Sequence, residues 1–181
     1  MNDTDHHGEV ISKDAVRFRR LLPGPIERVW EHLVDGDKRG RWLCSGDTGT
    51  AVGEPVAIIF RNFELTKAED TPPPDKHKDM PKEVSFSGTI TAWDPPRVFA
   101  HTWELGDEHS EVRYELEARG EQVLLTLTNT RLHSREMVVD VCGGWHAHLD
   151  ILEEILSGEE PGPFWKRIRR YEKIYEARVA Q

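Results

Sequence analysis

The stretch GGWHAHLDILEEIL, Gly143–Leu156, decides how the chain folds. At about 100° per residue its apolar side chains fall within one sector of a helix, with one histidine at the edge of that sector. The sector contains Trp145, His148, Leu149, Leu152, Ile155 and Leu156. The stretch therefore predicts a long helix that packs one face against another layer of the protein.

Two histidines and an aspartate in this stretch raise the question of metal binding. His146 and His148 would lie about 160° apart around a helix, so they cannot hold one ion together. His146 and Asp150 have the i, i+4 spacing of a helical metal site, but no third ligand accompanies them in the sequence. We therefore expect this pair on a solvated helix face, and we predict no metal site and no cofactor.

The segments before this helix alternate apolar and polar residues with a period of two, which is typical of antiparallel strands. They are EPVAIIFRNFEL, VSFSGTITAW, RVFAHTWEL, EVRYELEA and QVLLTLTNTRL. An earlier strand is expected over residues 16–21, and PGPIERVWEHLV predicts a short amphipathic helix after it. Strands grouped in sequence, with helices apart from them, indicate an α+β fold.

The length of 181 residues suits one well-buried domain. We expect a disordered leader over residues 1–13, a single domain over residues 14–158 and a helical extension over residues 159–181. The polar, proline-rich segment 66–82 is expected to be a mobile surface loop.

Acidic side chains outnumber basic ones, 33 against 24, which gives a net charge of −9. This balance argues against nucleic acid as a partner, and no apolar run approaches the ~20 residues that span a bilayer. The N-terminus has no apolar signal-peptide core, and Cys44 and Cys142 match no metal or redox spacing. We therefore expect a cytoplasmic protein without stable membrane insertion.

Several predicted strands place polar side chains on the face that also carries large apolar ones. Phe99, His101 and Trp103 share one strand face, and Asn129 follows three apolar residues on another. An inward histidine or asparagine is usually a hydrogen-bonded core group, and this is the plainer interpretation of His148 as well. Large aromatic rings with a few convergent polar groups also form ligand pockets, and the sequence favours that interpretation.

Four segments, in chain order, carry a resemblance to a known family. They are LPGPIERVWEHLVDGDKRGRWL, FSGTITAWDPPRVFAHTWEL, LLTLTNTRL and GGWHAHLDILEEILSG. Together they resemble the START-like (SRPBCC) superfamily, and within it the short, single-domain bacterial form of the heat-shock-protein-90 ATPase activator homologues. The similarity covers residues 16–158.

The resemblance implies a helix-grip fold, in which a curved antiparallel sheet wraps around the long C-terminal helix and two short helices close one end. It also implies a cavity for a small hydrophobic or amphipathic ligand between the helix and the sheet, with the loop TPPPDKHKDMPK, residues 71–82, near its mouth. The residues expected to bind this ligand are Trp30, Trp42, Phe60, Phe99, His101, Trp103, Asn129, Trp145, His148 and Leu152. Asn129 stands where such sequences often have a histidine, and an amide can orient a ligand but cannot titrate.

The tail PGPFWKRIRRYEKIYEARV, residues 161–179, combines aromatic and basic residues at near-helical spacing. Three interpretations stay open: a helix packed on the domain, a contact helix in a homodimer, and an amphipathic helix that binds a membrane or an acidic protein.

Three functions compete on the sequence alone. The first is the binding of a small apolar ligand, and the second is a cyclase or dehydratase with a cavity histidine as acid or base. For the enzyme, His101 and His148 are the only catalytic candidates, and no nucleophile motif accompanies them. The third is modulation of a chaperone ATPase, which rests on the family name alone. The eukaryotic activators use a further N-terminal domain for that role, and we expect the short acidic leader not to replace it.

Overall fold

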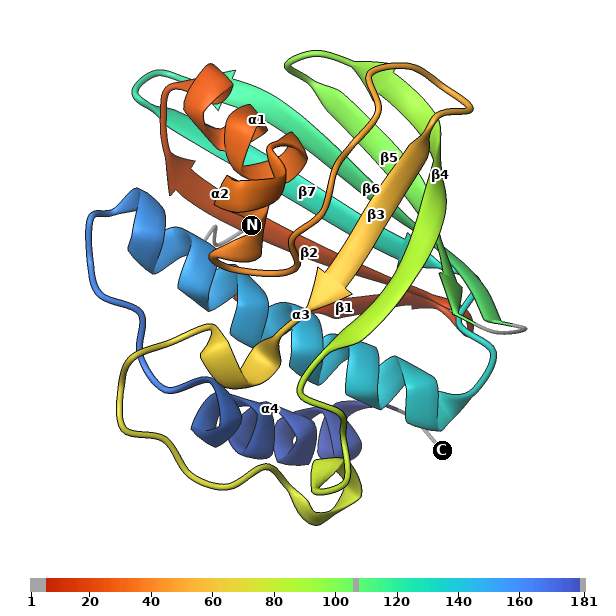
Figure 1. Cartoon of the computed structure of the whole chain (residues 1–181), viewed down its shortest axis with the longest axis vertical. Helices are drawn as coiled ribbons and strands as arrows, with labels where there is room; N and C mark the ends of the chain where they lie inside the picture. Colours follow the sequence, from red (N-terminus) through yellow and green to blue (C-terminus); the bar gives the residue numbers. More distant parts are fainter. Residues whose placement is uncertain (1–5, 106–107, 180–181) are drawn as a thin grey trace.

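Seven antiparallel strands form one curved sheet, and the long predicted helix lies across it, with a further helix on the far side of that helix (Figure 1). The computed structural model describes residues 6–105 and 108–179. Along the sheet the strand order is β1-β2-β7-β6-β5-β4-β3. The strands are β1 (Glu9–Ser12), β2 (Ala15–Pro23), β3 (Pro55–Phe60), β4 (Val84–Asp94), β5 (Val98–Leu105), β6 (Glu108–Arg119) and β7 (Gln122–Thr130).

The helices stand apart from the run of strands in sequence, so the predicted α+β helix-grip fold is confirmed. The α-helices are α1 (Ile26–Val34), α2 (Gly36–Gly40), α3 (Arg135–Leu156) and α4 (Phe164–Arg178), and the 3-10 turns are η1 (Asn62–Glu64) and η2 (Asp75–His77). Helix α3 begins where the Ser134 hydroxyl accepts a hydrogen bond from the Met137 amide, an N-cap that satisfies an amide with no partner inside the helix.

Alternation along the strands decides which side chains face α3. In β3, Val56 and Ile58 are fully buried and Phe60 packs against the core, so these three side chains form the inward row of the strand. In β7 the inward row is buried as well, and it consists of Val123, Leu125, Leu127 and Asn129. The inner faces of the strands and one side of α3 therefore form a single hydrophobic core.

Helices α1 and α2 close one end of the sheet. The ring of Trp30 in α1 lies 5.2 Å from the ring of Trp93 and 6.3 Å from that of Phe99. In α2 the buried guanidinium of Arg39 donates hydrogen bonds to the carbonyl oxygens of Leu33, Cys44, Gly46 and Ala57 and to the Thr48 hydroxyl. These contacts fill the closed end with packed side chains.

Helix α3 lies between two layers, the sheet on one side and α4 on the other (Figure 1). His146 is therefore only 4% exposed: its ring stacks on Tyr171 at 3.7 Å, and its Nδ1 lies 2.9 Å from the Tyr175 hydroxyl. The prediction of a solvated face for His146 and Asp150 is wrong, because the tail forms a helix that covers it. The tail itself is a packed helix, in agreement with the first of its three interpretations.

The N-terminal segment is more ordered than the sequence predicts. Residues 9–12 form β1 and pair with β2, so the prediction of disorder over residues 1–13 is wrong for this part of the leader. The Gly8 amide also donates a hydrogen bond to the Tyr175 hydroxyl in α4, at 2.6 Å. The first five residues lie outside the described part of the chain.

Segment 66–82 is held by α4 rather than free. The Asp70 carboxylate accepts hydrogen bonds from the amides of Trp165 and Lys166 at the start of α4, at 2.7 and 2.9 Å. Arg169 donates to the carbonyl oxygens of Pro72 and Pro73. The expectation of a mobile loop is therefore wrong, because the cap at the start of α4 and the Arg169 side chain fix the segment from outside its own sequence.

Across residues 6–105 and 108–179, no helix has the length and apolar character needed to cross a membrane. The same residues contain no cluster of three or more histidine, cysteine or acidic side chains with a geometry for holding a metal ion.

Candidate ligand-binding pocket

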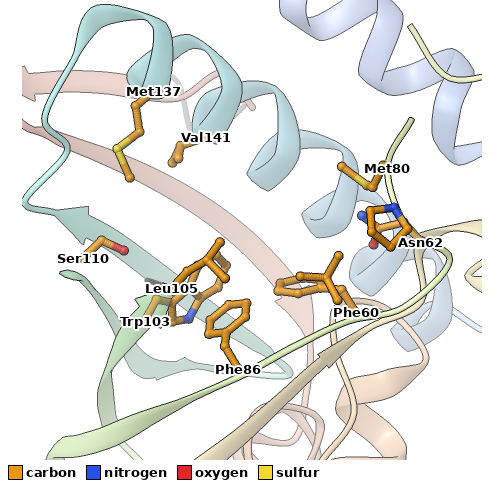
Figure 2. Close-up of a pocket in the computed structure, with 11 residues that line it drawn as sticks. Phe60, Asn62, Met80, Phe86, Trp103, Leu105, Ser110, Met137 and Val141 are labelled. Atoms are coloured by element: carbon orange, nitrogen blue, oxygen red, sulfur yellow. The ribbon is translucent and has the colours of Figure 1, made fainter. Parts of the chain in front are cut away.

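A pocket of about 280 Å³ lies between the first turns of α3 and the ends of β3 to β6 that are remote from α1 (Figure 2). This volume is close to the lower end of the range for small-molecule sites, about 300–1,000 Å³. Its lining is mostly apolar and comes from strands β3 to β6, from the segment between β3 and β4, and from α3. The lining residues are Phe60, Asn62, Met80, Pro81, Val84, Phe86, Trp103, Leu105, Ser110, Met137 and Val141.

Local structure explains how these side chains meet. Phe60 is the last residue of β3 and continues its inward row, while Trp103 and Leu105 continue the inward row of β5. Met137 and Val141 are four residues apart, so they lie on one face of α3 and look down on the strands. Leu105 is 48% exposed and marks the mouth of the pocket.

The floor of the pocket is aromatic. The rings of Phe60 and Phe86 stack with centroids 6.0 Å apart, and each meets the indole of Trp103 edge to face, at 5.5 and 6.0 Å. Such offset and edge-to-face pairs are the preferred arrangements of aromatic rings. They hold the floor in one geometry and leave ring faces and edges available to a bound molecule.

Segment 66–82 supplies one wall, through Met80 and Pro81, which confirms that this segment borders the pocket. Just before them, Lys76 forms ion pairs with Asp140 in α3 and with Glu172 in α4, the second at 3.3 Å. His77 Nε2 also lies 2.6 Å from Glu172 Oε1. The wall is therefore attached to both helices.

Two of the residues predicted to bind ligand, Phe60 and Trp103, line this pocket. Trp145 lies one layer behind, with its ring 5.4 Å from that of Trp103. Its Nε1 donates to Asn129 Oδ1 at 2.9 Å, and Asn129 Nδ2 donates to the Glu111 carbonyl at 3.1 Å. The two residues are thus a buried, hydrogen-bonded support for the floor and do not themselves line the pocket.

The remaining apolar residues predicted to bind ligand lie at the closed end of the sheet, outside the lining of this pocket. Trp30, Trp42, Phe99 and Leu152 are buried there, and Trp42 Nε1 donates to the His32 carbonyl at 2.8 Å. These four side chains do not line the pocket: they are buried in the core, where the rings of Trp30, Trp93 and Phe99 pack against one another.

The two candidate catalytic histidines also lie outside the pocket lining. His148 donates from Nδ1 to the Trp42 carbonyl at 2.7 Å, and its ring sits behind Phe60 at 6.1 Å. The ring of His101 lies against Phe99 and Tyr114, and its Nδ1 is 3.1 Å from the Thr102 carbonyl. Burial lowers the pKa of each to about 4. Both are therefore neutral at pH 7, and neither is placed to transfer a proton in the pocket.

Several pocket residues were missed from the sequence. Val84 and Phe86 alternate with polar residues in VSFSGTITAW, so the inward face of that segment could have included them. Met80 and Met137 are the only methionines besides Met1, and both line the pocket. Methionine is common at adaptable binding surfaces, and this was a usable signal.

A second polar cluster lies between β2, α3 and α4. Arg20, on the inward face of β2, is 2% exposed and has Nη2 3.7 Å from Asp150 Oδ1. Asp150 accepts a hydrogen bond from the Tyr171 hydroxyl. Burial lowers the pKa of Arg20, while the nearby carboxylates favour its charged form. The cluster ties α4 to the domain.

Comparison with known proteins places the fold in context. The family described as "Activator of Hsp90 ATPase homolog 1-like protein" matches residues 23–157. A protein from Bordetella parapertussis, solved in solution by NMR, is 42% identical with a TM-score of 0.80, and the match covers 98% of this chain and 92% of that one.

More distant structures share the fold alone. CalU16 from Micromonospora echinospora is 23% identical with a TM-score of 0.67, over 97% of this chain and 96% of that one. A conserved protein of unknown function from Enterococcus faecalis is 14% identical with a TM-score of 0.66, over 98% and 92%. Among curated proteins, none matches the chain.

Proposed function

The chain belongs to the Activator of Hsp90 ATPase homolog 1-like family, and on that premise we propose that it binds one small, largely apolar molecule in the pocket between α3 and the sheet. One observation carries the proposal: the pocket opens beside Leu105 and has apolar or aromatic side chains on nearly all of its lining, with none that ionises among the described lining residues. A preformed apolar pocket with a few polar groups is the general form of a small-molecule site.

Acid–base catalysis is not part of the proposal. A proton-transfer enzyme needs a titrating group within hydrogen-bond reach of its substrate. His101 and His148 are buried behind the pocket floor with lowered pKa values, and their nearest hydrogen-bond partners are backbone carbonyls. The geometry therefore favours binding over turnover.

A neutral fluorescent probe, N-phenyl-1-naphthylamine, tests the proposal. The protein should bind it at one site with increased fluorescence, and Val141→Trp should weaken binding at least tenfold because the indole occupies much of the pocket. Val52→Trp is the matched control, since Val52 is 64% exposed and remote from the lining. Equal probe affinity in the wild type and in a folded Val141→Trp variant would refute the proposal.

Thermal stabilisation gives an independent measurement. Probe at one hundred times its Kd should stabilise the fold by about 2.7 kcal/mol. For a domain of this size that corresponds to a rise in Tm of roughly 5–10 °C. Native mass spectrometry of freshly purified protein should show any retained ligand as a discrete added mass.

A further inference from the structure

The pocket is apolar overall but contains polar atoms that have no partner. Trp103 Nε1 and Asn62 Oδ1 are both covered from solvent, and neither has a hydrogen-bond partner within the described part of the chain. Both residues line the pocket. A buried donor or acceptor without a partner costs on the order of 1–3 kcal/mol, so most proteins satisfy such groups. A ligand that satisfies both would recover this free energy on binding.

The two orphan atoms have opposite hydrogen-bond characters. The indole Nε1 of Trp103 is a donor only, and the amide oxygen of Asn62 is an acceptor only. In the view of Figure 2, Trp103 and Asn62 lie at opposite ends of the aromatic floor, with Phe60 between them. A molecule that lies along the floor would therefore meet a donor at one end and an acceptor at the other.

The walls indicate a flat, aromatic shape. Below are the rings of Phe60, Phe86 and Trp103, and two flexible thioethers, Met80 and Met137, approach from the segment 66–82 and from α3 (Figure 2). Thioether sulfur makes favourable contacts with aromatic rings, and aromatic rings pair well with one another. A planar ring system lying over this floor would contact both kinds of group at once.

The volume and the charge of the pocket narrow the class of ligand further. An engineered apolar cavity of ~150 Å³ takes up benzene, so about 280 Å³ is suited to two fused rings. Among the described lining residues none carries a charge, and a charged group moved into such surroundings loses its hydration without gaining a counter-ion.

From these observations we propose that the pocket recognises a neutral bicyclic aromatic compound with a hydrogen-bond acceptor at one end and a hydroxyl or N–H donor at the other. The acceptor pairs with Trp103 Nε1 and the donor with Asn62 Oδ1, after small side-chain rotations that uncover these atoms. This inference rests on the proposed function and adds to it the chemistry of the ligand.

Five compounds of similar size separate the contributions. Naphthalene has only the flat bicyclic shape, quinoline adds a hydrogen-bond acceptor, and 2-naphthol adds a hydroxyl donor. 6-Quinolinol has the acceptor and the hydroxyl at opposite ends. 6-Hydroxy-2-naphthoate has a similar shape but is an anion. Each is measured by displacement of N-phenyl-1-naphthylamine at pH 7.5. Each satisfied hydrogen bond should improve affinity roughly three- to tenfold. 6-Quinolinol should therefore bind about tenfold or more tightly than naphthalene, and the anion more weakly than either.

Two conservative variants assign the polar contacts. Trp103→Phe keeps an aromatic floor and removes the donor, so quinoline should lose its advantage over naphthalene while naphthalene itself binds nearly as before. Asn62→Leu keeps the volume and removes the acceptor, so 6-quinolinol should lose its advantage over quinoline. The two variants act at different ends of the pocket, so one of them still decides its own contact if the other fails to fold.

The outcomes distinguish this inference from the proposed function. Naphthalene binding without any preference for 6-quinolinol, or a preference that survives both variants, overturns the inference and leaves apolar binding intact. Binding of the naphthoate as tight as that of 6-quinolinol overturns the neutral-ligand part. Failure of all five compounds to displace a bound probe whose affinity Val141→Trp weakens overturns the inference and leaves the proposed function intact, whereas a probe whose affinity Val141→Trp leaves unchanged overturns both.

Discussion

Replacing Trp145 with alanine tests whether the floor of the pocket rests on a packed layer. The indole is 3% exposed, lies 5.4 Å from Trp103 and 6.1 Å from Tyr114, and donates to Asn129 Oδ1. A buried tryptophan cut to alanine costs about 3–5 kcal/mol. The Asn129 oxygen, left buried without its donor, adds on the order of 1 kcal/mol or more.

We therefore expect Trp145→Ala to lower the free energy of unfolding by about 5 kcal/mol. For a domain of this length, that corresponds to a fall in Tm of roughly 10–20 °C. Urea unfolding followed by circular dichroism measures the change directly, provided that the m-value stays constant. The variant should also bind the naphthylamine probe less tightly, because Trp103 loses its support.

Trp145→Phe is the matched control. It keeps most of the buried ring and removes only the hydrogen bond to Asn129, so its cost should be about 1–3 kcal/mol. A loss below about 2 kcal/mol for Trp145→Ala would mean that the indole is not in a packed layer. The orientation assigned to α3, and with it the position of the pocket, would then be wrong.

Acid should destabilise the fold through His101 and His148. Burial lowers the pKa of each to about 4 in the folded chain, against an ordinary value of 6.5. Between these two values the unfolded chain binds more protons than the folded one, so stability falls as the pH drops from about 6.5 to 4. The loss in the free energy of unfolding is on the order of 3 kcal/mol for each histidine. Urea unfolding midpoints from pH 7.5 to 4.5 measure this loss, and His148→Gln should make stability fall less steeply with pH. An unchanged pH dependence in that variant would contradict the lowered pKa of His148. Two adjacent glycines in α3 should respond oppositely to alanine. Gly144→Ala should raise Tm by a few degrees, since nothing lies within 4 Å of the new methyl group and alanine favours the helix by ~1 kcal/mol over glycine. Gly143→Ala should lower Tm, because its methyl group would lie 3.0 Å from Cγ of Glu172. Equal melting shifts for the two variants would contradict the close approach of α3 and α4.

The fold was predictable because its signals are local. The period of two in the strands and the apolar sector of Gly143–Leu156 each report which side chains point the same way. In the segment EPVAIIFRNFEL the period of two places Val56 and Ile58 on one face, and both are fully buried. Such patterns describe one face of one element, and this was sufficient for the layers of the helix-grip fold.

The position of the pocket was not predictable in the same way. Phe99 and Trp103 are four residues apart in β5, so both point to the inner face of the sheet. Phe99 is nevertheless buried beneath α1, whereas Trp103 lines the pocket. What separates them is the volume of rings such as Trp30 and Trp42, which arrive from the N-terminal helices. Parity tells which side chains enter the interior, but only the packing of all elements together tells where the interior is left unfilled.

His146 shows the same limit for a helix. Asp150, one turn away, suggests a solvated face. The helix that covers His146 is α4, which begins at Phe164, in a segment whose own pattern left three interpretations open. Burial of a polar residue by a distant element leaves little trace in the local sequence, because the hydrogen bonds that compensate it come from side chains elsewhere.

The attachment of segment 66–82 to α4 has a consequence for where this protein can be shortened. The family match ends at residue 157, so Met80 and Pro81 fall inside it while the helix that anchors their segment falls outside. A chain cut after Gly158 would keep all the strands and α3 but would lose the amides that Asp70 caps and the Glu172 carboxylate beside His77. Such a chain should lose the contacts that hold segment 66–82, and it should expose the face of α3 that Tyr171 and Tyr175 cover. The contacts that hold the wall of the pocket therefore extend beyond the end of the family match.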